Sequence, residues 1–244
     1  MTLSAKAIEK GLNHPDRHTR LEWIQSTEFT PTPEQIERGL TDSDSEVRSA
    51  WAQRMDFAPT PEQIERGLTD KDRWVRRAWA ERFDFTPTPK QVERGLTDKA
   101  VYVREAWYGR KDFIPTPEQT ERGLTDKEWL CRAAWVKRRD FIATPEQVER
   151  GLTDQSGSVR LEWVRRTDFT PTSEQIRRGL RDESGLVVLV WMERNDLEWT
   201  DADIRAGLCS PHDGIREAWE RVLARKNAIS GIALQDADDI YPSV

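Results

Sequence analysis

The chain has 244 residues, of which 34% are charged, and its formal net charge is −6. This acidic balance argues against a general DNA-binding protein, because such domains are usually basic. The two cysteines, Cys131 and Cys209, lack metal-site spacing and argue against a disulfide framework, and no apolar run approaches the length of a membrane span. The first residues, Met1 to Lys6, lack the apolar core of a secretion signal. We therefore expect a cytoplasmic protein without a membrane partner.

A repeat of 28 residues fills the sequence from Met1 to Ala224. Three columns share this spacing: a glycine, the leucine after it, and a tryptophan. The tryptophan column is Trp23, Trp51, Trp79, Trp107, Trp135, Trp163, Trp191 and Trp219. A period of about 20 to 50 residues is typical of stacked repeats, so we predict an all-α fold. The predicted α-solenoid has eight two-helix repeats, at 1–28, 29–56, 57–84, 85–112, 113–140, 141–168, 169–196 and 197–224, and a C-terminal tail at 225–244.

The second repeat illustrates the first of the two expected helices. The segment Thr32–Gln35 predicts its start, with threonine as the N-cap, proline at the first helical position and glutamine completing a capping box. Ile36 and Leu40 are four residues apart and share one face of that helix. Gly39 suits either a helix C-cap or the close approach of another chain segment.

The second helix of this repeat is expected to start near Ser43, because Ser43 and Glu46 have the spacing of a capping box. Its apolar face is formed by Val47, Ala50 and Trp51. Helices this short are not stable alone in water, so packing between repeats must hold them.

The sequence around the second helix resembles HEAT-like repeats. The shared pattern is a leucine, a turn aspartate, then valine, arginine and a small residue, as in Leu40–Asp42 and Glu46–Ala50. The short repeat also resembles the leucine-rich-variant repeats. The resemblance implies a ladder between successive repeats, in which the turn aspartates face the arginines. Its members would be Asp42, Asp70, Asp98, Asp126 and Asp154 with Arg48, Arg76, Arg104, Arg132 and Arg160. Val188 replaces the seventh arginine and Ser210 the eighth aspartate.

The tryptophan column is expected to lie in the core. A residue kept in every repeat serves the stacking that all repeats share, and tryptophan buries a large area. The alternative is an exposed aromatic ladder on which nucleic-acid bases stack.

Two columns of arginine recur, and we name each after its member in the second repeat. The Arg38 column is Arg38, Arg66, Arg94, Arg122, Arg150 and Arg178. The Arg54 column is Arg54, Arg82, Arg110, Arg138, Arg166 and Arg194. Carboxylates accompany both columns, which favours ion pairs and packing over the tryptophan rings. The alternative is that the Arg54 column, through Arg54, Arg82, Arg110, Arg138 and Arg166, follows the phosphates of a nucleic acid.

Three central repeats carry large apolar residues near the start of the second helix, where most other repeats have small, polar or charged residues. Neighbouring helices pack about 8–10 Å apart, so these residues would form a ridge of roughly 20 Å. Aromatic side chains among cations, here including Lys99 and Lys127, are typical of interface hot spots. The alternative is extra packing between repeats. We define the central ridge as Arg73, Trp74, Arg77, Tyr102, Trp129 and Leu130.

An apolar run near the C-terminus, Leu186–Trp191, is too continuous for every side chain to face the core from one helix. We expect the tail to cover its exposed part, because solenoids need capped ends. The alternative is that a partner covers it, or a second copy of this chain in a homodimer formed through Leu186–Val190. The apolar residues of the tail are Ile229, Ile232, Ala233 and Leu234.

The sequence offers no constellation of nucleophile, acid, base or metal ligand, because nearly all its carboxylates recur repeat by repeat. We therefore expect no enzymatic activity, catalytic residue, metal site or cofactor. The sequence favours a non-enzymatic protein that binds another protein through the central ridge, as an adaptor, scaffold or inhibitor. Nucleic-acid binding along the Arg54 column is the alternative, and an enzyme acting on nucleic acid is the third hypothesis.

Overall fold

The computed structural model describes residues 3–210 and 213–240, and it describes side chains as far as residue 228. Within these residues the chain forms sixteen α-helices and no strand. The chain divides into two units, Met1–Phe141 and Ile142–Val244. The predicted all-α solenoid of two-helix repeats is confirmed, because each unit is built from successive helix pairs.

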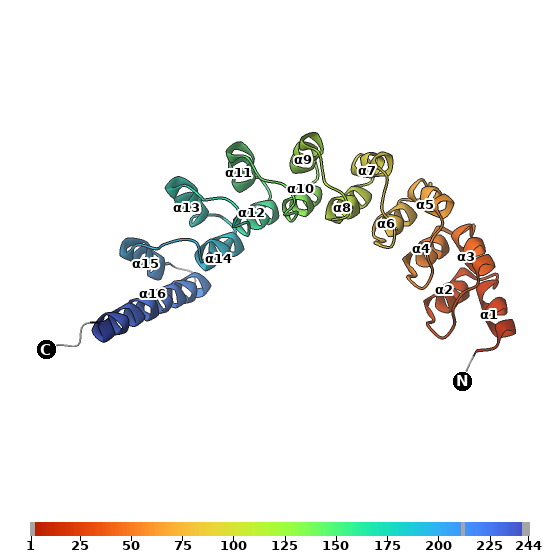
Figure 1. The fold of residues 1–244 in the computed structure, drawn as a ribbon, viewed down its shortest axis with the longest axis horizontal. Helices are drawn as coiled ribbons and strands as arrows, with labels where there is room; N and C mark the ends of the chain where they lie inside the picture. The colour runs from red at the N-terminus through yellow and green to blue at the C-terminus, as the bar shows by residue number, and fades with distance from the viewer. Residues whose placement is uncertain (1–2, 211–212, 241–244) are drawn as a thin grey trace. The chain divides into compact units, whose positions relative to one another are not determined.

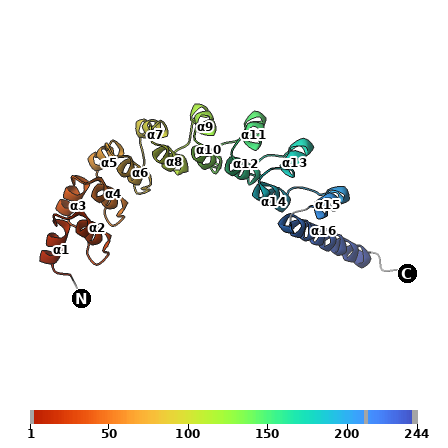
Figure 2. The same cartoon turned by 180° about the vertical axis from the view of Figure 1, so that it is seen from behind.

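The first unit contains five helix pairs. Its odd-numbered helices form one row and its even-numbered helices a second row, as the two opposite views show (Figures 1 and 2). Each even-numbered helix packs against the next even-numbered helix and against its own partner. The pairs are α1 (Ala5–Leu12) with α2 (Arg17–Gln25), α3 (Pro33–Leu40) with α4 (Ser45–Gln53), α5 (Pro61–Leu68) with α6 (Arg73–Ala80), α7 (Pro89–Leu96) with α8 (Val101–Gly109), and α9 (Pro117–Leu124) with α10 (Trp129–Val136).

The second unit contains three pairs with the same arrangement: α12 packs against α14, and α14 against α16. The pairs are α11 (Pro145–Leu152) with α12 (Gly157–Val164), α13 (Ser173–Gly179) with α14 (Gly185–Glu193), and α15 (Asp201–Leu208) with α16 (Asp213–Ile240). The predicted tail thus continues the last helix as far as Ile240. The side chains on which the capping prediction rests, from Ile229 to Leu234, lie outside the described residues.

The first helix of each repeat begins where the sequence predicts. Thr32 is the N-cap of α3 and forms a capping box with Gln35. The Gln35 N–H donates to Thr32 Oγ1 at 3.3 Å, and the Thr32 N–H donates to Gln35 Oε1 at 3.0 Å. The same box opens α5, α7, α9, α11 and α13. Local side chains therefore satisfy the backbone donors at these helix starts.

The predicted start of the second helix near Ser43 is wrong. α4 begins at Ser45, and its N-cap is Asp44, whose carboxylate accepts from the Glu46 N–H at 2.9 Å. The reason is the turn that precedes it: the Asp42 carboxylate accepts from the Asp44 N–H at 2.8 Å. This bond keeps Ser43 in the turn, so the helix starts after it.

The repeated glycine is required by the close approach of the tryptophan. A Cβ atom on Gly39 would lie 2.1 Å from Nε1 of Trp51, and no described glycine has a positive φ. Of the two roles predicted for Gly39, close approach is therefore the one the structure shows. The seven members of the tryptophan column from the second repeat to the eighth are at most 3% exposed, which confirms that the column lies in the core. Trp23 of the first repeat is half-buried.

Candidate functional site

The aspartate–arginine ladder is present, and within each unit it joins neighbouring repeats. Arg48 donates from Nε and Nη2 to the carboxylate of Asp70 at 2.8 and 2.9 Å. Its Nη1 donates to the carbonyl of Asp42, in the turn of its own repeat, at 2.8 Å. Each arginine thus holds two consecutive turns in register. The described ladder pairs are Arg20–Asp42, Arg48–Asp70, Arg76–Asp98, Arg104–Asp126 and Arg160–Asp182.

Three ladder carboxylates, those of Asp70, Asp98 and Asp126, are favoured in their ionised form. Burial raises the pKa of Asp98, but hydrogen bonds from Arg76 and from the Ala100 N–H lower it more, so that the pKa lies below its ordinary value. The same balance lowers the pKa of Asp70 and Asp126. Because these carboxylates are paired with arginines of the preceding repeat, they are not free to bind a ligand.

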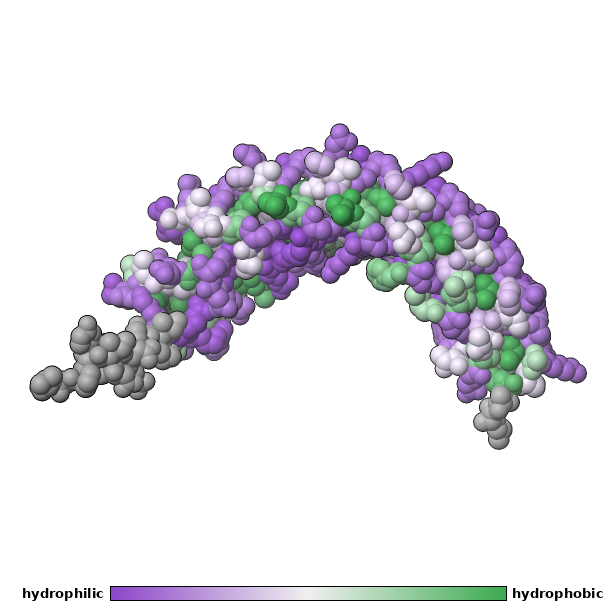
Figure 3. All heavy atoms as spheres, viewed as in Figure 1, coloured by the Kyte–Doolittle hydropathy of each residue, from purple (hydrophilic) through white to green (hydrophobic). Residues whose placement is uncertain are grey.

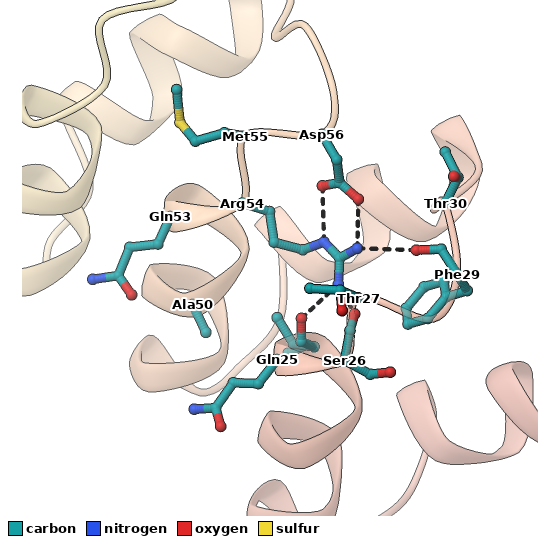
Figure 4. Close-up of a pocket in the computed structure, with 11 residues that line it drawn as sticks. Gln25, Ser26, Thr27, Phe29, Thr30, Ala50, Gln53, Arg54, Met55 and Asp56 are labelled. Atoms are coloured by element: carbon teal, nitrogen blue, oxygen red, sulfur yellow. Dashed lines mark hydrogen bonds and ion pairs between the residues drawn. The ribbon is translucent and has the colours of Figure 1, made fainter.

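The Arg54 column, the alternative nucleic-acid site, lies inside the repeats. Arg54 donates to the carbonyls of Ile24, Ser26 and Phe29 at 2.5, 3.0 and 3.2 Å, and to both carboxylate oxygens of Asp56 (Figure 4). These bonds use every N–H group of the guanidinium. An open cavity of about 590 Å³ lies beside this arginine. The Arg54 guanidinium therefore has no free N–H group with which to bind a ligand in that cavity.

The other members of the column are buried more deeply. Arg82, Arg110, Arg138 and Arg166 are at most 3% exposed. Arg110 donates to the carbonyl of Ala80 and lies over the rings of Phe85 and Trp107 at 4.7 and 5.2 Å. Such residues cannot follow a phosphate backbone without unpacking the repeats, so the structure removes the support for that alternative.

The Arg38 column is more exposed but paired with carboxylates. Arg94 donates to both carboxylate oxygens of Glu65, in the preceding repeat, at 2.7 and 2.9 Å. Gln91 donates to the same carboxylate at 3.0 Å. The column therefore forms a second, outer ladder between repeats.

Four residues of the central ridge form one cluster in the first unit. Trp74 and Tyr102 are 42% and 38% exposed, and their rings stack with centroids 5.2 Å apart at an interplanar angle of 23°. The guanidinium of Arg73 lies 5.2 Å from the Trp74 centroid. That of Arg77 lies 5.8 Å from Trp74 and 5.7 Å from Tyr102. The ridge therefore presents a stacked aromatic pair bordered by two cations.

The remaining two ridge residues differ from this cluster. Leu130 occupies the repeat position of Trp74 and Tyr102 and is half-buried. Trp129, one position earlier in its repeat, is 48% exposed and stacks on neither ring within the described residues. α8 packs between α6 and α10, so all six residues lie on three consecutive helices.

Three lysines at the turns before these helices complete the surface. Lys71, Lys99 and Lys127 each follow a ladder aspartate and are exposed. The sequence alone places Lys99 and Lys127 among the cations of the central repeats, whereas Lys71 is found only when the turn position is compared across repeats. That position holds Ser43, Gln155 and Glu183 in other repeats.

The apolar run on α14 is mostly packed. Val187 and Val188 are buried, Leu189 is half-buried, and Leu186 is 65% exposed. Val188 belongs to an apolar cluster with Met192, Trp199, Ile204 and Trp219. The homodimer alternative therefore rests mainly on Leu186.

The described surface is otherwise largely polar. Hydrophobic residues form separate patches among hydrophilic ones on the face shown in Figure 3. In the part of the chain that the structure describes, no helix is long and apolar enough to cross a membrane. No group of three or more histidine, cysteine, aspartate or glutamate residues is arranged there to hold a metal ion.

Comparisons with known proteins agree with this architecture. A family model described as a HEAT repeat associated with sister chromatid cohesion matches residues 34–50, which span α3 and most of α4. A solved structure, a leucine-rich repeat variant with a novel repetitive protein structural motif, has a TM-score of 0.57 and 23% identity. The match covers 88% of this chain and 79% of that one. No curated protein matches the sequence.

The sixteen helices of the described residues form a helical repeat fold, and these likenesses are consistent with a HEAT-like helical repeat protein. Repeat folds of this kind serve in general as scaffolds for protein interaction, because their stacked repeats offer extended surfaces.

Proposed function

We propose that this chain is a non-enzymatic binding protein that holds another protein against the central ridge. The observation that carries the proposal is the Trp74–Tyr102 pair, whose rings stack on each other at the surface instead of entering the core. Aromatic residues among arginines dominate the binding energy at many protein interfaces.

The geometry of the pair favours binding because it is already ordered. Each ring is held by the other and by Arg77, which also forms an ion pair with Glu81 at 2.7 Å. A side chain that is ordered before binding loses less conformational entropy when the partner arrives. The ridge can therefore supply apolar area at low entropic cost.

The titratable groups support a role without catalysis. The carboxylates of the described residues whose pKa is lowered belong mainly to the two ladders and the helix caps. Burial raises the pKa of the Cys131 thiol to about 12, and burial also raises the pKa of Tyr108. A nucleophilic cysteine needs a lowered pKa and access to solvent, and Cys131 is buried.

The test compares two double variants of the full chain in capture experiments. Trp74→Ala with Tyr102→Ala removes the stacked pair. Phe83→Ala with Ile114→Ala is the matched control, because these residues are 69% and 87% exposed and lie outside the ridge. Each tagged protein is incubated with lysate of the native host, with and without nuclease treatment, and captured proteins are quantified by mass spectrometry.

We expect at least one defined protein to be lost with the ridge variant and retained with the control. Equal capture by both variants, or capture that vanishes with nuclease alone, contradicts the proposal. Circular dichroism and urea unfolding check that both variants stay folded. If the ridge variant unfolds, Arg73→Glu with Arg77→Glu tests the same surface without creating a cavity, and unchanged capture by that variant also contradicts the proposal.

A further inference from the structure

The turn position that follows each ladder aspartate is basic only in the repeats that carry the central ridge. It holds Lys71, Lys99 and Lys127 there, and Ser43, Gln155 and Glu183 in repeats on either side. We call the three lysines the lysine column. All three are exposed, and none of their ammonium groups forms an ion pair within the described residues, whereas most described arginines do. The chain therefore keeps three exposed cations without a direct ion pair in register with its exposed aromatic residues, although Lys71 and Lys99 also attract the carboxylates of Asp70 and Asp98.

The ladder fixes the position of the lysine column. The carbonyls of Lys71 and Lys99 accept hydrogen bonds from Arg76 and Arg104 at 3.3 and 3.4 Å. The carbonyl of Lys127 accepts from Arg132 at 3.2 Å. Each turn is thereby anchored to the arginine of its own repeat. Since Lys71 and Lys99 precede Trp74 and Tyr102 by three residues, the cations and the rings share the edge at which α6 and α8 begin.

The aromatic geometry disfavours nucleic-acid bases as the ligand. The Tyr102 ring and the guanidinium groups of Arg73 and Arg77 all lie within 6 Å of the Trp74 centroid, at 5.2, 5.2 and 5.8 Å. Base stacking needs a free aromatic face, and the Trp74 ring is already in contact with the protein's own groups.

We propose that the lysine column and the central ridge together bind an extended acidic segment of a partner protein. This inference rests on the proposed function and names the chemistry of the partner. Successive helices lie about 8–10 Å apart, so the lysines are spaced at roughly that distance. A polyproline-II chain has three residues per turn and rises about 3.1 Å per residue, so every third side chain faces the same way about 9 Å further on. The fitting segment carries an acidic residue at every third position.

The two sets of residues have different tasks in this binding mode. Apolar side chains between the acidic residues pack against the exposed edges of Trp74, Tyr102 and Trp129. The lysines favour partners whose acidic residues have this spacing, and they increase the rate of association. Exposed charges contribute more to specificity and association rate than to affinity. Charge reversal of the lysines is therefore expected to weaken binding without changing the fold.

The test measures binding of a defined probe to the full chain by fluorescence anisotropy. The probe is a fluorescein-labelled peptide of four Glu-Leu-Pro triplets, which favours the polyproline-II conformation. The comparison peptide has glutamine in place of every glutamate. The test variant is Lys71→Glu with Lys99→Glu and Lys127→Glu. The matched control is Lys10→Glu with Lys90→Glu and Lys111→Glu, which changes three exposed lysines outside the column and gives the same net charge.

We expect the glutamate peptide to bind more tightly than the glutamine peptide, and the test variant to weaken its binding by about tenfold or more. The control should bind as the natural chain does. Equal binding of both peptides, or equal weakening in both triple variants, overturns the inference. Displacement of the glutamate peptide by a twelve-nucleotide oligo(dT), with loss of oligo(dT) binding in the test variant, also overturns it in favour of single-stranded nucleic acid.

The capture experiment separates this inference from the proposed function. If the captured protein depends on Trp74 and Tyr102 but is retained by the lysine variant, the ridge binds a protein that is not recognised by acidic spacing. That result overturns the inference and leaves the proposed function standing. If no captured protein depends on the ridge, the proposed function itself fails.

Discussion

The guanidinium of Arg76 is joined to the carboxylate of Asp98, 22 residues later, by hydrogen bonds of 2.7 and 2.8 Å. Its Nη1 also donates to the carbonyl of Asp70 at 2.9 Å. One side chain thus connects the turn of its own repeat with that of the next. Near the C-terminus both members of such a pair are replaced together, by Val188 and Ser210, and Val188 joins an apolar cluster. This joint replacement avoids a buried charge without a partner.

Removing one residue of a ladder pair should therefore destabilise the protein more, relative to its share of the contact, than replacing both residues together. Asp98→Ser leaves the nearly buried Arg76 without its carboxylate, and such a change costs about 3–5 kcal/mol. Arg76→Val with Asp98→Ser should be less destabilised than the sum of the two single variants. Urea unfolding of the four proteins gives the coupling energy. Additive effects of the two changes would show that the pair does not act as a unit.

Acid should destabilise the protein between about pH 4.5 and pH 2. Hydrogen bonds from Arg94 and Gln91 lower the pKa of Glu65 to about 2, and the pKa of Asp98 is also lowered. The folded protein therefore binds fewer protons than the unfolded chain in this range. The stability from these carboxylates is complete above their unfolded pKa and is lost as the pH falls through the folded value.

The measurement is the urea midpoint at a series of pH values from about 6 to about 2.5. Glu65→Gln should reduce the loss of stability on acidification, because it removes one such carboxylate. Glu62→Gln is the matched control, on the same helix and without an ion pair in the described residues. An identical pH profile for Glu65→Gln and the natural chain would contradict the prediction.

Alanine at Gly95 should destabilise the protein strongly. Its Cβ atom would lie 2.2 Å from the indole of Trp107, which is 1% exposed and has no room to move. Overpacking of this kind costs about 1–3 kcal/mol, or more where the core cannot relax. Gly109→Ala is the control in the same repeat, because its Cβ meets nothing within 4 Å. It should stabilise the chain by about 0.4–1 kcal/mol. Similar thermal unfolding of both variants would rule out the close approach.

A missing helix cap offers a stabilising change. The Asp72 carboxylate caps α6 by accepting from the Trp74 N–H at 2.8 Å, whereas Ala100 precedes α8 without any side-chain cap. The two residues have closely similar backbone angles. Ala100→Asp should therefore raise the free energy of unfolding by about 1 kcal/mol, and Asp72→Ala should lower it by a similar amount. Urea unfolding measures both, and no gain from aspartate at position 100 would mean that the cap does not form.

The features that could be predicted from sequence are those that depend on local chemistry or on the period. The capping box at Thr32 needs only residues within one turn, so the start of α3 follows from the sequence. The core position of the tryptophans follows because every repeat has the same neighbours. The sequence predicts too early a start for the second helix, because Ser43 and Asp44 are adjacent and either could be its N-cap. The bond from the Asp44 N–H to the Asp42 carboxylate decides between them.

By itself the sequence determined the period, the helix pairs and the alignment of large apolar residues in the central repeats. The tertiary structure decided the burial of the Arg54 column, since a guanidinium can be buried only when its N–H groups have partners. For Arg54 three of those partners are backbone carbonyls, which no side-chain pattern reveals: those of Ile24 and Ser26 in the preceding repeat and that of Phe29 at the start of its own. The tertiary structure also decided the stacking of Trp74 on Tyr102. That contact depends on the distance and rotation between neighbouring repeats, which are set by packing across the whole interface.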